Sequence, residues 1–143
     1  MKRSEVRDFL EDGILLLTDV SYGSGRMSEF NSDRSQSYPM AWIESLRVST
    51  SLKQIPYDTW AIRIHISKQD TPDSVEGQYE TIVDQSDELA QELIRYYDQV
   101  ITDHQLITIG SITRDPFIKK HADCLTGVIL AFTLTAPDKT NLC

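Results

Sequence analysis

The stretch SDELAQELIRYYDQVITDH, residues Ser86–His104, decides the fold of this chain. Ser86 is expected to cap a helix here. Its apolar residues recur at spacings of three and four, as on one face of an α-helix. They are Leu89, Leu93, Ile94, Tyr97, Val100 and Ile101. A helix with one apolar face must pack that face against another element. The stretch therefore predicts an α+β domain built around one long helix.

Two segments with the character of β-strands precede this helix, and two follow it. Tyr38–Thr50, with a break near Ser45, and Trp60–Ile66 are expected to pair as an antiparallel hairpin. Leu106–Thr113 and Leu125–Thr135 form a second pair. The last of these is apolar on both faces, which is typical of a central or interface-covered strand. The sequence predicts an antiparallel or mixed four-stranded sheet of two β-hairpins.

The clearest strand, Trp60–Ile66, alternates between large apolar residues and smaller or polar ones. Such alternation predicts one buried face and one face in water. The residues expected to be buried are Trp60, Ile62, Ile64 and Ile66, and those expected to face water are Ala61, Arg63 and His65.

An N-terminal helix is predicted over Glu5–Leu16, with Ser4 as its N-cap. Gly13 weakens a helix interior by about 1 kcal/mol relative to alanine, so the helix could instead end there and leave an extended LLLT segment. Both helices are expected to pack on one face of the sheet.

The remaining segments are predicted to be loops of one domain that spans residues 1–143. Ser21–Ser37 is rich in glycine and serine, and is expected to be either a flexible loop or an arm ordered by a neighbouring subunit. Gln69–Val83 is expected to be a polar connection or an extended hairpin arm, Arg114–Asp123 is expected to be a polar loop, and Ala136–Cys143 a polar tail. The basic spot Arg114, Lys119 and Lys120 could meet an acidic patch on a neighbouring copy.

The composition argues against several classes of protein. A formal net charge of −8 disfavours a general nucleic-acid-binding surface, although it suits a protein that surrounds DNA without gripping it. Cys124 and Cys143 are expected to be reduced thiols. The short apolar run Ile14–Leu17 predicts neither a signal peptide nor a membrane span. We therefore expect a cytosolic origin and no contact with a membrane.

No catalytic motif stands out in the sequence. His121 and Cys124 form an HxxC pair without the further ligands that a zinc site needs. A nuclease-type metal cluster is the alternative, but solvated loop charge accounts better for its acidic residues. Those residues are Asp70, Asp73, Glu76 and Glu80. The sequence predicts a protein that is not an enzyme, without catalytic, cofactor-binding or metal-binding residues.

Three stretches carry a resemblance to a known class of proteins. They are SYPMAWIESLRVST (residues 37–50), WAIRIHISKQDTPDSVEGQYETIVDQSDELAQELIRYY (residues 60–97) and DCLTGVILAFTLTAPDKTNLC (residues 123–143). In these stretches the chain resembles the head–tail connector proteins of tailed bacteriophages, most of all tail-terminator-like neck proteins, in a style similar to that of crAss-like phages.

The resemblance implies a structural virion protein that forms a ring, of six or twelve copies, in the phage neck or at the tail top. Such a ring joins portal-side proteins to the tail, and DNA passes through its centre without sequence-specific binding. It implies assembly in the cytoplasm of the bacterial host and no active-site residues. The alternatives are a small metal-dependent nuclease-like enzyme and a module that binds a host protein.

Overall fold

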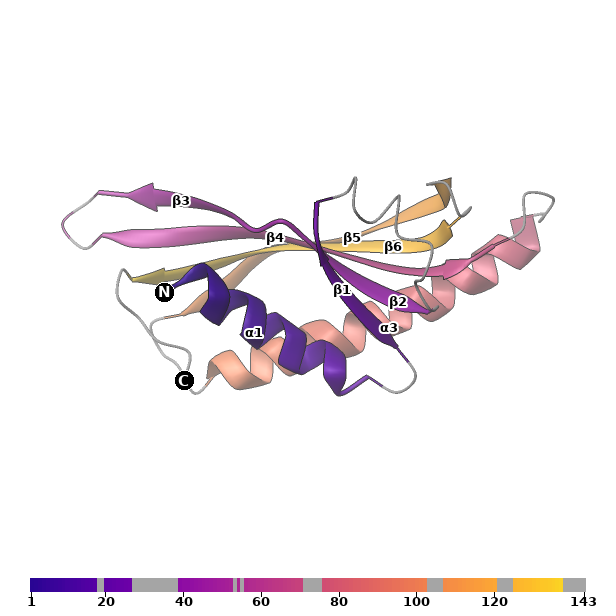
Figure 1. Ribbon diagram of the computed structural model, residues 1–143, viewed down its shortest axis with the longest axis horizontal. Helices are drawn as coiled ribbons and strands as arrows, with labels where there is room; N and C mark the ends of the chain where they lie inside the picture. Colours follow the sequence, from indigo (N-terminus) through magenta and orange to yellow (C-terminus); the bar gives the residue numbers. More distant parts are fainter. Residues whose placement is uncertain are drawn as a thin grey trace.

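The computed structural model describes residues 1–17, 20–26, 39–52, 54, 56–70, 76–102, 107–120 and 125–137. Two helices lie on one face of a six-stranded sheet (Figure 1). The prediction of an α+β fold with helices on one face of the sheet is confirmed. The predicted number of strands, four, was too low. The elements are α1 (Arg3–Leu15), β1 (Ser21–Gly25), β2 (Met40–Glu44), β3 (Arg47–Ser51), β4 (Tyr57–Gln69), α3 (Glu76–Thr102), β5 (Thr108–Lys120) and β6 (Leu125–Pro137).

The sheet is mixed and open, with strand order β1-β2-β4-β6-β5. Strand β1 is parallel to β2, and the other neighbours are antiparallel. Strands β2 and β3 pair one after the other with β4, on the same side of it. The predicted antiparallel pairing and the break near Ser45 are therefore confirmed. Strand β6 lies between β4 and β5, as its two apolar faces indicated.

Strand β1 overturns the prediction that the whole of Ser21–Ser37 is a loop. Its five residues lack the alternation of a strand, but each pairs with a residue of β2. Gly23 makes the contact possible, because a Cβ atom there would lie 2.3 Å from the indole of Trp42. The Trp42 Nε1–H also donates to the Gly25 carbonyl at 3.4 Å. Residues 27–38 lie outside the described part of the chain.

Helix α3 begins ten residues before the expected start at Ser86. Ser86 is buried in its middle and does not cap it. The apolar stripe continues towards the N-terminus through half-buried Tyr79 and Val83, and Val83 packs against the core. The prediction of a connection without helix over Gln69–Val83 was therefore wrong from Glu76 onward. Two apolar residues at helical spacing, Tyr79 and Val83, extend the helix there. His104 and residues 71–75 lie outside the described residues.

Helix α1 starts close to the predicted position but without the predicted cap. It begins at Arg3, with Lys2 at the N-cap position. The Lys2 backbone N–H donates to the Glu5 carboxylate at 3.0 Å, which satisfies one free amide of the first turn. Ser4 lies inside the helix and is exposed.

Strand β5 continues through most of the predicted loop Arg114–Asp123, up to Lys120. The polar sequence suggested a loop, but pairing with β6 and the burial of Phe117 stabilise a strand here. Pro116 is tolerated because β5 is an edge strand, where a missing N–H interrupts no ladder. The ladder has two irregularities, one of them at Ser111, whose φ is 53°. His121 and Cys124 lie outside the described residues, as does the tail beyond Pro137, which ends at Cys143.

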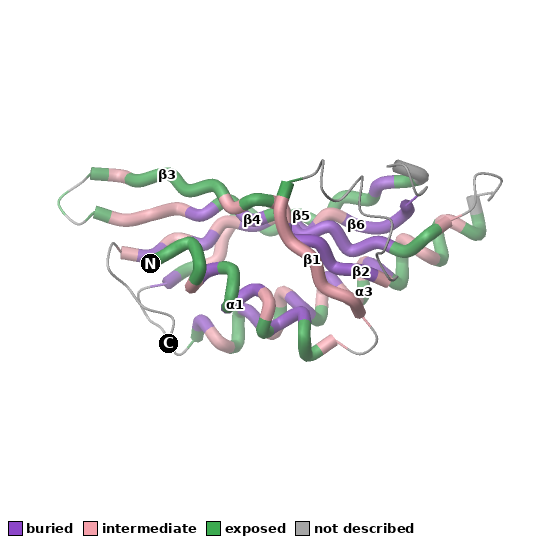
Figure 2. Tube along the Cα trace, viewed as in Figure 1, coloured by how far each residue is buried: buried purple, intermediate pink, exposed green. Residues whose placement is uncertain are grey.

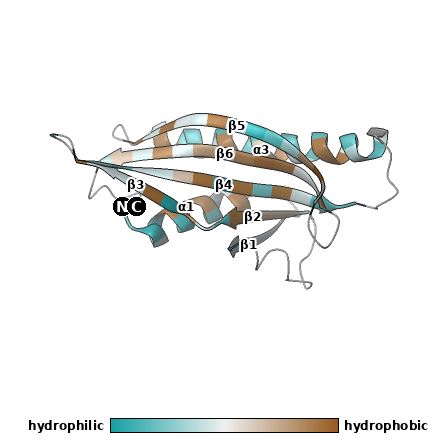
Figure 3. Cartoon of the chain, turned by 90° about the horizontal axis from the view of Figure 1, so that it is seen from above, coloured by the Kyte–Doolittle hydropathy of each residue, from teal (hydrophilic) through white to brown (hydrophobic). Residues whose placement is uncertain are grey.

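The main core lies between the helices and the sheet (Figure 2). Its residues follow β4 and β6, which carry the longest hydrophobic runs of the sheet (Figure 3). The four apolar residues predicted for the inner face of β4 are all buried. On the outer face, Ala61 and Arg63 are exposed, but His65 is buried, which contradicts its predicted contact with water.

A second, smaller core explains the burial of His65. It lies on the sheet face opposite the helices, where Met40, Trp42, Phe117 and Leu125 pack together. The centroids of the His65 and Phe117 rings are 6.0 Å apart. These apolar residues come from three strands that meet only in the folded sheet, so the alternation of one strand did not reveal them.

The two helices approach each other closely at Gly13. A Cβ atom there would lie 2.5 Å from the ring of Tyr97, so the glycine that weakens α1 also permits its packing. The Tyr97 hydroxyl donates to the Leu10 carbonyl at 2.6 Å. Burial, followed by the nearby charges, raises the pKa of Tyr97 well above its ordinary value and keeps this hydroxyl protonated.

Candidate functional site at a notch in the sheet edge

The break between β2 and β3 leaves a notch in one edge of the sheet. We use "the notch" for Ser45 and Leu46 together with the two cavities that flank them. One cavity, of about 190 Å³, opens towards α1. The other, of about 290 Å³, lies on the opposite face of the sheet and is lined by Arg47, Ala61 and Arg63.

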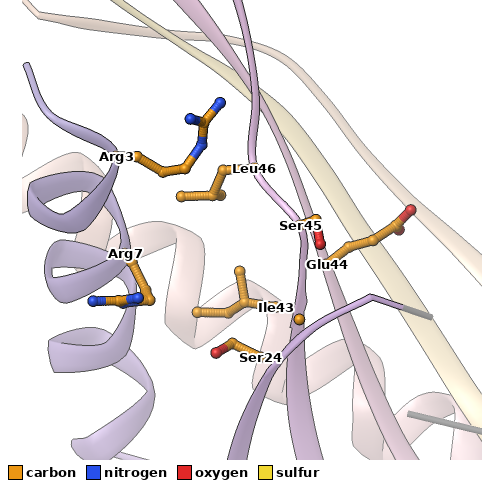
Figure 4. A pocket seen from close by; sticks show the side chains of 8 residues that line it. Arg3, Arg7, Ser24, Ile43, Glu44, Ser45 and Leu46 are labelled. Carbon is orange, nitrogen blue, oxygen red and sulfur yellow. The ribbon is translucent and has the colours of Figure 1, made fainter. Parts of the chain in front are cut away.

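The cavity beside α1 has an apolar floor and a basic rim. The side chains of Ile43 and Leu46 point towards α1, whereas Glu44 points away from it (Figure 4). Arg3 and Arg7, one turn apart on α1, line the helix side of the cavity. The Arg3 guanidinium also lies 5.6 Å from the centre of the Trp60 ring, a cation–π distance that fixes its position.

On the opposite face, Glu44 joins two cationic or potentially cationic side chains. Its Oε2 atom lies 3.0 Å from Nε2 of His65 and accepts a hydrogen bond from Nε of Arg63, also at 3.0 Å. Partial burial alone would raise the pKa of the Glu44 carboxyl. The hydrogen bonds and charges of His65 and Arg63 outweigh that effect and lower the pKa below its ordinary value.

We expect Glu44→Gln to destabilise the protein at pH 7 by about 1 kcal/mol, since the site is partly exposed. A carboxyl whose pKa is lowered in the folded protein stabilises the fold at pH values above the ordinary pKa of that group. This contribution is lost as the pH falls through the lowered pKa of the folded state. The stability difference between wild type and variant should therefore shrink in acid. Urea unfolding between pH 7 and pH 3 measures it. A difference that grows in acid would contradict this account of Glu44.

Four arginines thus surround the notch in a chain of net charge −8. They are Arg3, Arg7, Arg47 and Arg63. Sequence reasoning missed this site because Arg3 and Arg7 are far in the chain from Arg47 and Arg63, and the four share no motif. Only the pairing of β3 with β4 and the packing of α1 beside β2 bring them together.

The basic spot that the sequence identified consists of Arg114, Lys119 and Lys120, and Arg114 forms a contact within the chain. The Arg114 Nη1 atom donates to Asp87 of α3 at 3.1 Å, so this arginine ties β5 to the helix. The side chains of Lys119 and Lys120 are outside the described part of the structure.

The exposed side of α3 carries an acidic ridge. Glu80, Asp84, Glu88 and Glu92 are all exposed and follow one another at intervals of four residues. Side chains four apart on a helix are neighbours, so these carboxylates repel one another. None of the ion pairs in the described part of the chain involves them.

The acidic residues considered for a metal site belong to separate elements. Asp70 follows β4 and accepts a hydrogen bond from the Thr126 hydroxyl at 2.8 Å, whereas Glu80 lies on the ridge of α3. Glu76 starts α3, and Asp73 is outside the described residues. Within the described ranges, no three His, Cys, Asp or Glu side chains are grouped so that they could hold a metal ion.

The two edges of the sheet expose apolar side chains. On the β3 side, Val48 is 40% exposed and Leu52 is 86% exposed. On the β5 side, Ile112 and Ile118 are exposed, and each lines a groove between β5 and α3. Exposed apolar side chains at sheet edges are typical of protein–protein contacts.

No protein-family profile matches the sequence, and no curated protein does. Among the described helices, none is long and apolar enough to span a membrane. The fold and the surfaces above are therefore the basis for a functional proposal.

Proposed function

We propose that this protein is a structural subunit of a ring in the neck or at the tail top of a tailed bacteriophage. The observation that carries the proposal is the open sheet with two different exposed edges, β3 on one side and β5 with α3 on the other. Contact between two different surfaces of identical subunits is heterologous, and it gives a ring when the rotation closes.

The charge of the chain supports a place around DNA. A net charge of −8 keeps phosphate groups from binding strongly, so DNA would slide through the centre of the ring. The proposed neighbours are portal-side proteins on one side and tail proteins on the other, as the resemblance in sequence implies. The proposed copy number is six or twelve.

Electron microscopy and mass spectrometry of purified phage particles test the proposal. We expect the protein at the head–tail junction, in a copy number that is a multiple of six. Its absence from particles would refute the proposal. Calorimetric binding of Mg²⁺ would instead favour the nuclease alternative, and enrichment of one host protein in a pull-down would favour the host-binding module.

A further inference from the structure

The notch concentrates positive charge in an acidic chain, which indicates an anionic occupant. We propose that the notch of one copy receives the acidic ridge of a second copy. The inference rests on the proposed ring and adds the two surfaces through which neighbouring subunits recognise each other.

The notch offers positive charge that neighbouring carboxylates neutralise only in part, since Asp8 lies 4.0 Å from Arg7 and Glu44 lies 3.0 Å from Arg63. Arg7 and Arg63 side chains are 52% and 53% exposed. Glu44 also borders the cavity that Arg3 and Arg7 line, but its side chain points away from α1 and its carboxylate pairs with Arg63. Arginine suits this role, because its planar guanidinium pairs with carboxylates through two hydrogen bonds.

The ridge has the complementary charge and extends over several turns of α3. Its four carboxylates follow α3 from Glu80 to Glu92, a length of about 18 Å at 1.5 Å per residue. In the monomer these groups repel one another, and so do Arg3 and Arg7 on successive turns of α1. Docking brings each row of like charges against opposite charges, which removes both repulsions.

A second copy fits the notch better than nucleic acid does. A polyanion would be repelled by the rest of a chain with net charge −8, whereas the ridge is present on every copy. Both surfaces also have apolar residues beside their charges: Leu46 in the notch, and Val83 and Ile118 in the groove that Glu80 and Asp84 line. Because each copy has one notch and one ridge, the contact repeats from subunit to subunit.

Charge reversal on each surface tests the inference. Arg7→Glu reverses the notch, Glu88→Arg reverses the middle of the ridge, and Lys68→Glu is the control. Lys68 is exposed on β4 and does not line the notch. Lys68→Glu changes the net charge of the chain by the same amount as Arg7→Glu. We expect each surface variant to weaken self-association at low salt by about tenfold or more, and the control by much less. Sedimentation velocity over a concentration series measures this.

Mixing the two surface variants gives the sharpest result. Each keeps one native surface, so the native pair and the reversed pair can both form in the mixture. We expect the mixture to recover association that neither variant shows alone. Glu88→Arg should also leave the thermal stability of the monomer unchanged or higher, since it relieves repulsion along the ridge. A loss of association with a loss of stability would instead indicate damage to the fold and overturn the inference.

Other outcomes separate this inference from the ring proposal. Association that is insensitive to Arg7→Glu, or that strengthens with salt, would overturn the notch–ridge contact and leave the ring in place. A wild-type protein that stays monomeric at high concentration would also overturn it, while particle microscopy still decides the ring. Binding of a DNA duplex that is lost in Arg7→Glu would show that phosphate occupies the notch.

Discussion

Leu93→Asp is expected to unfold the protein. Leu93 is fully buried in the core between α3 and the sheet, where no water can hydrate a carboxylate. An unpaired charge in such a place costs about 4 kcal/mol or more, and a domain of this size is stable by only about 5–15 kcal/mol. Circular dichroism and urea unfolding should show loss of the cooperative transition or a much lower midpoint.

Ile112→Asp is the control for this prediction, because it introduces the same charge at an exposed apolar residue of β5. We expect it to change the free energy of unfolding by about 0.5 kcal/mol or less. Normal folding of Leu93→Asp would mean that the stripe of α3 faces away from the sheet, which contradicts the fold.

Gly127→Ala is expected to destabilise the protein by about 3–5 kcal/mol. Gly127 lies in β6 between β4 and β5, opposite Ser67 and Phe117. A Cβ atom at this position would lie 1.9 Å from the Ile66 carbonyl oxygen and 2.7 Å from the Ser67 Cα. Both are backbone atoms of β4, so the two central strands must separate to admit one methyl group. Urea unfolding followed by tryptophan fluorescence measures the loss.

Gly110→Ala is the matched control, since Gly110 also lies in the sheet, on β5. Its nearest obstacle is the Thr133 Oγ1 atom at 3.4 Å, an ordinary contact. We expect a change in stability of about 1 kcal/mol or less. Equal effects of the two substitutions would show that β4 and β6 do not approach as closely as the structure indicates.

The sequence by itself determined the elements with a strong period. The spacing of apolar residues predicted the central part of α3 and its buried face, including Leu93 and Tyr97. Strict alternation predicted the inner face of β4, and two apolar faces predicted the central place of β6. These patterns are local, because burial of one face imposes a period of 3.6 in a helix and 2 in a strand.

Only the tertiary structure decided the elements and surfaces without such a period. Strand β1 exists because Gly23 admits the Trp42 indole and because β2 offers free backbone groups. Polar segments before Ser86 and after Arg114 became parts of α3 and β5, since they gained buried contacts that local polarity conceals.

The notch depends on tertiary structure in the same way. Arg3 and Arg63 are sixty positions apart in the sequence, and the order of strands places them on either side of one break in the sheet. Charge carries no period that marks a binding surface, so the clustering of arginines appears only when the chain is folded. The candidate site was therefore beyond sequence reasoning, although the helix and the central strands that support it were not.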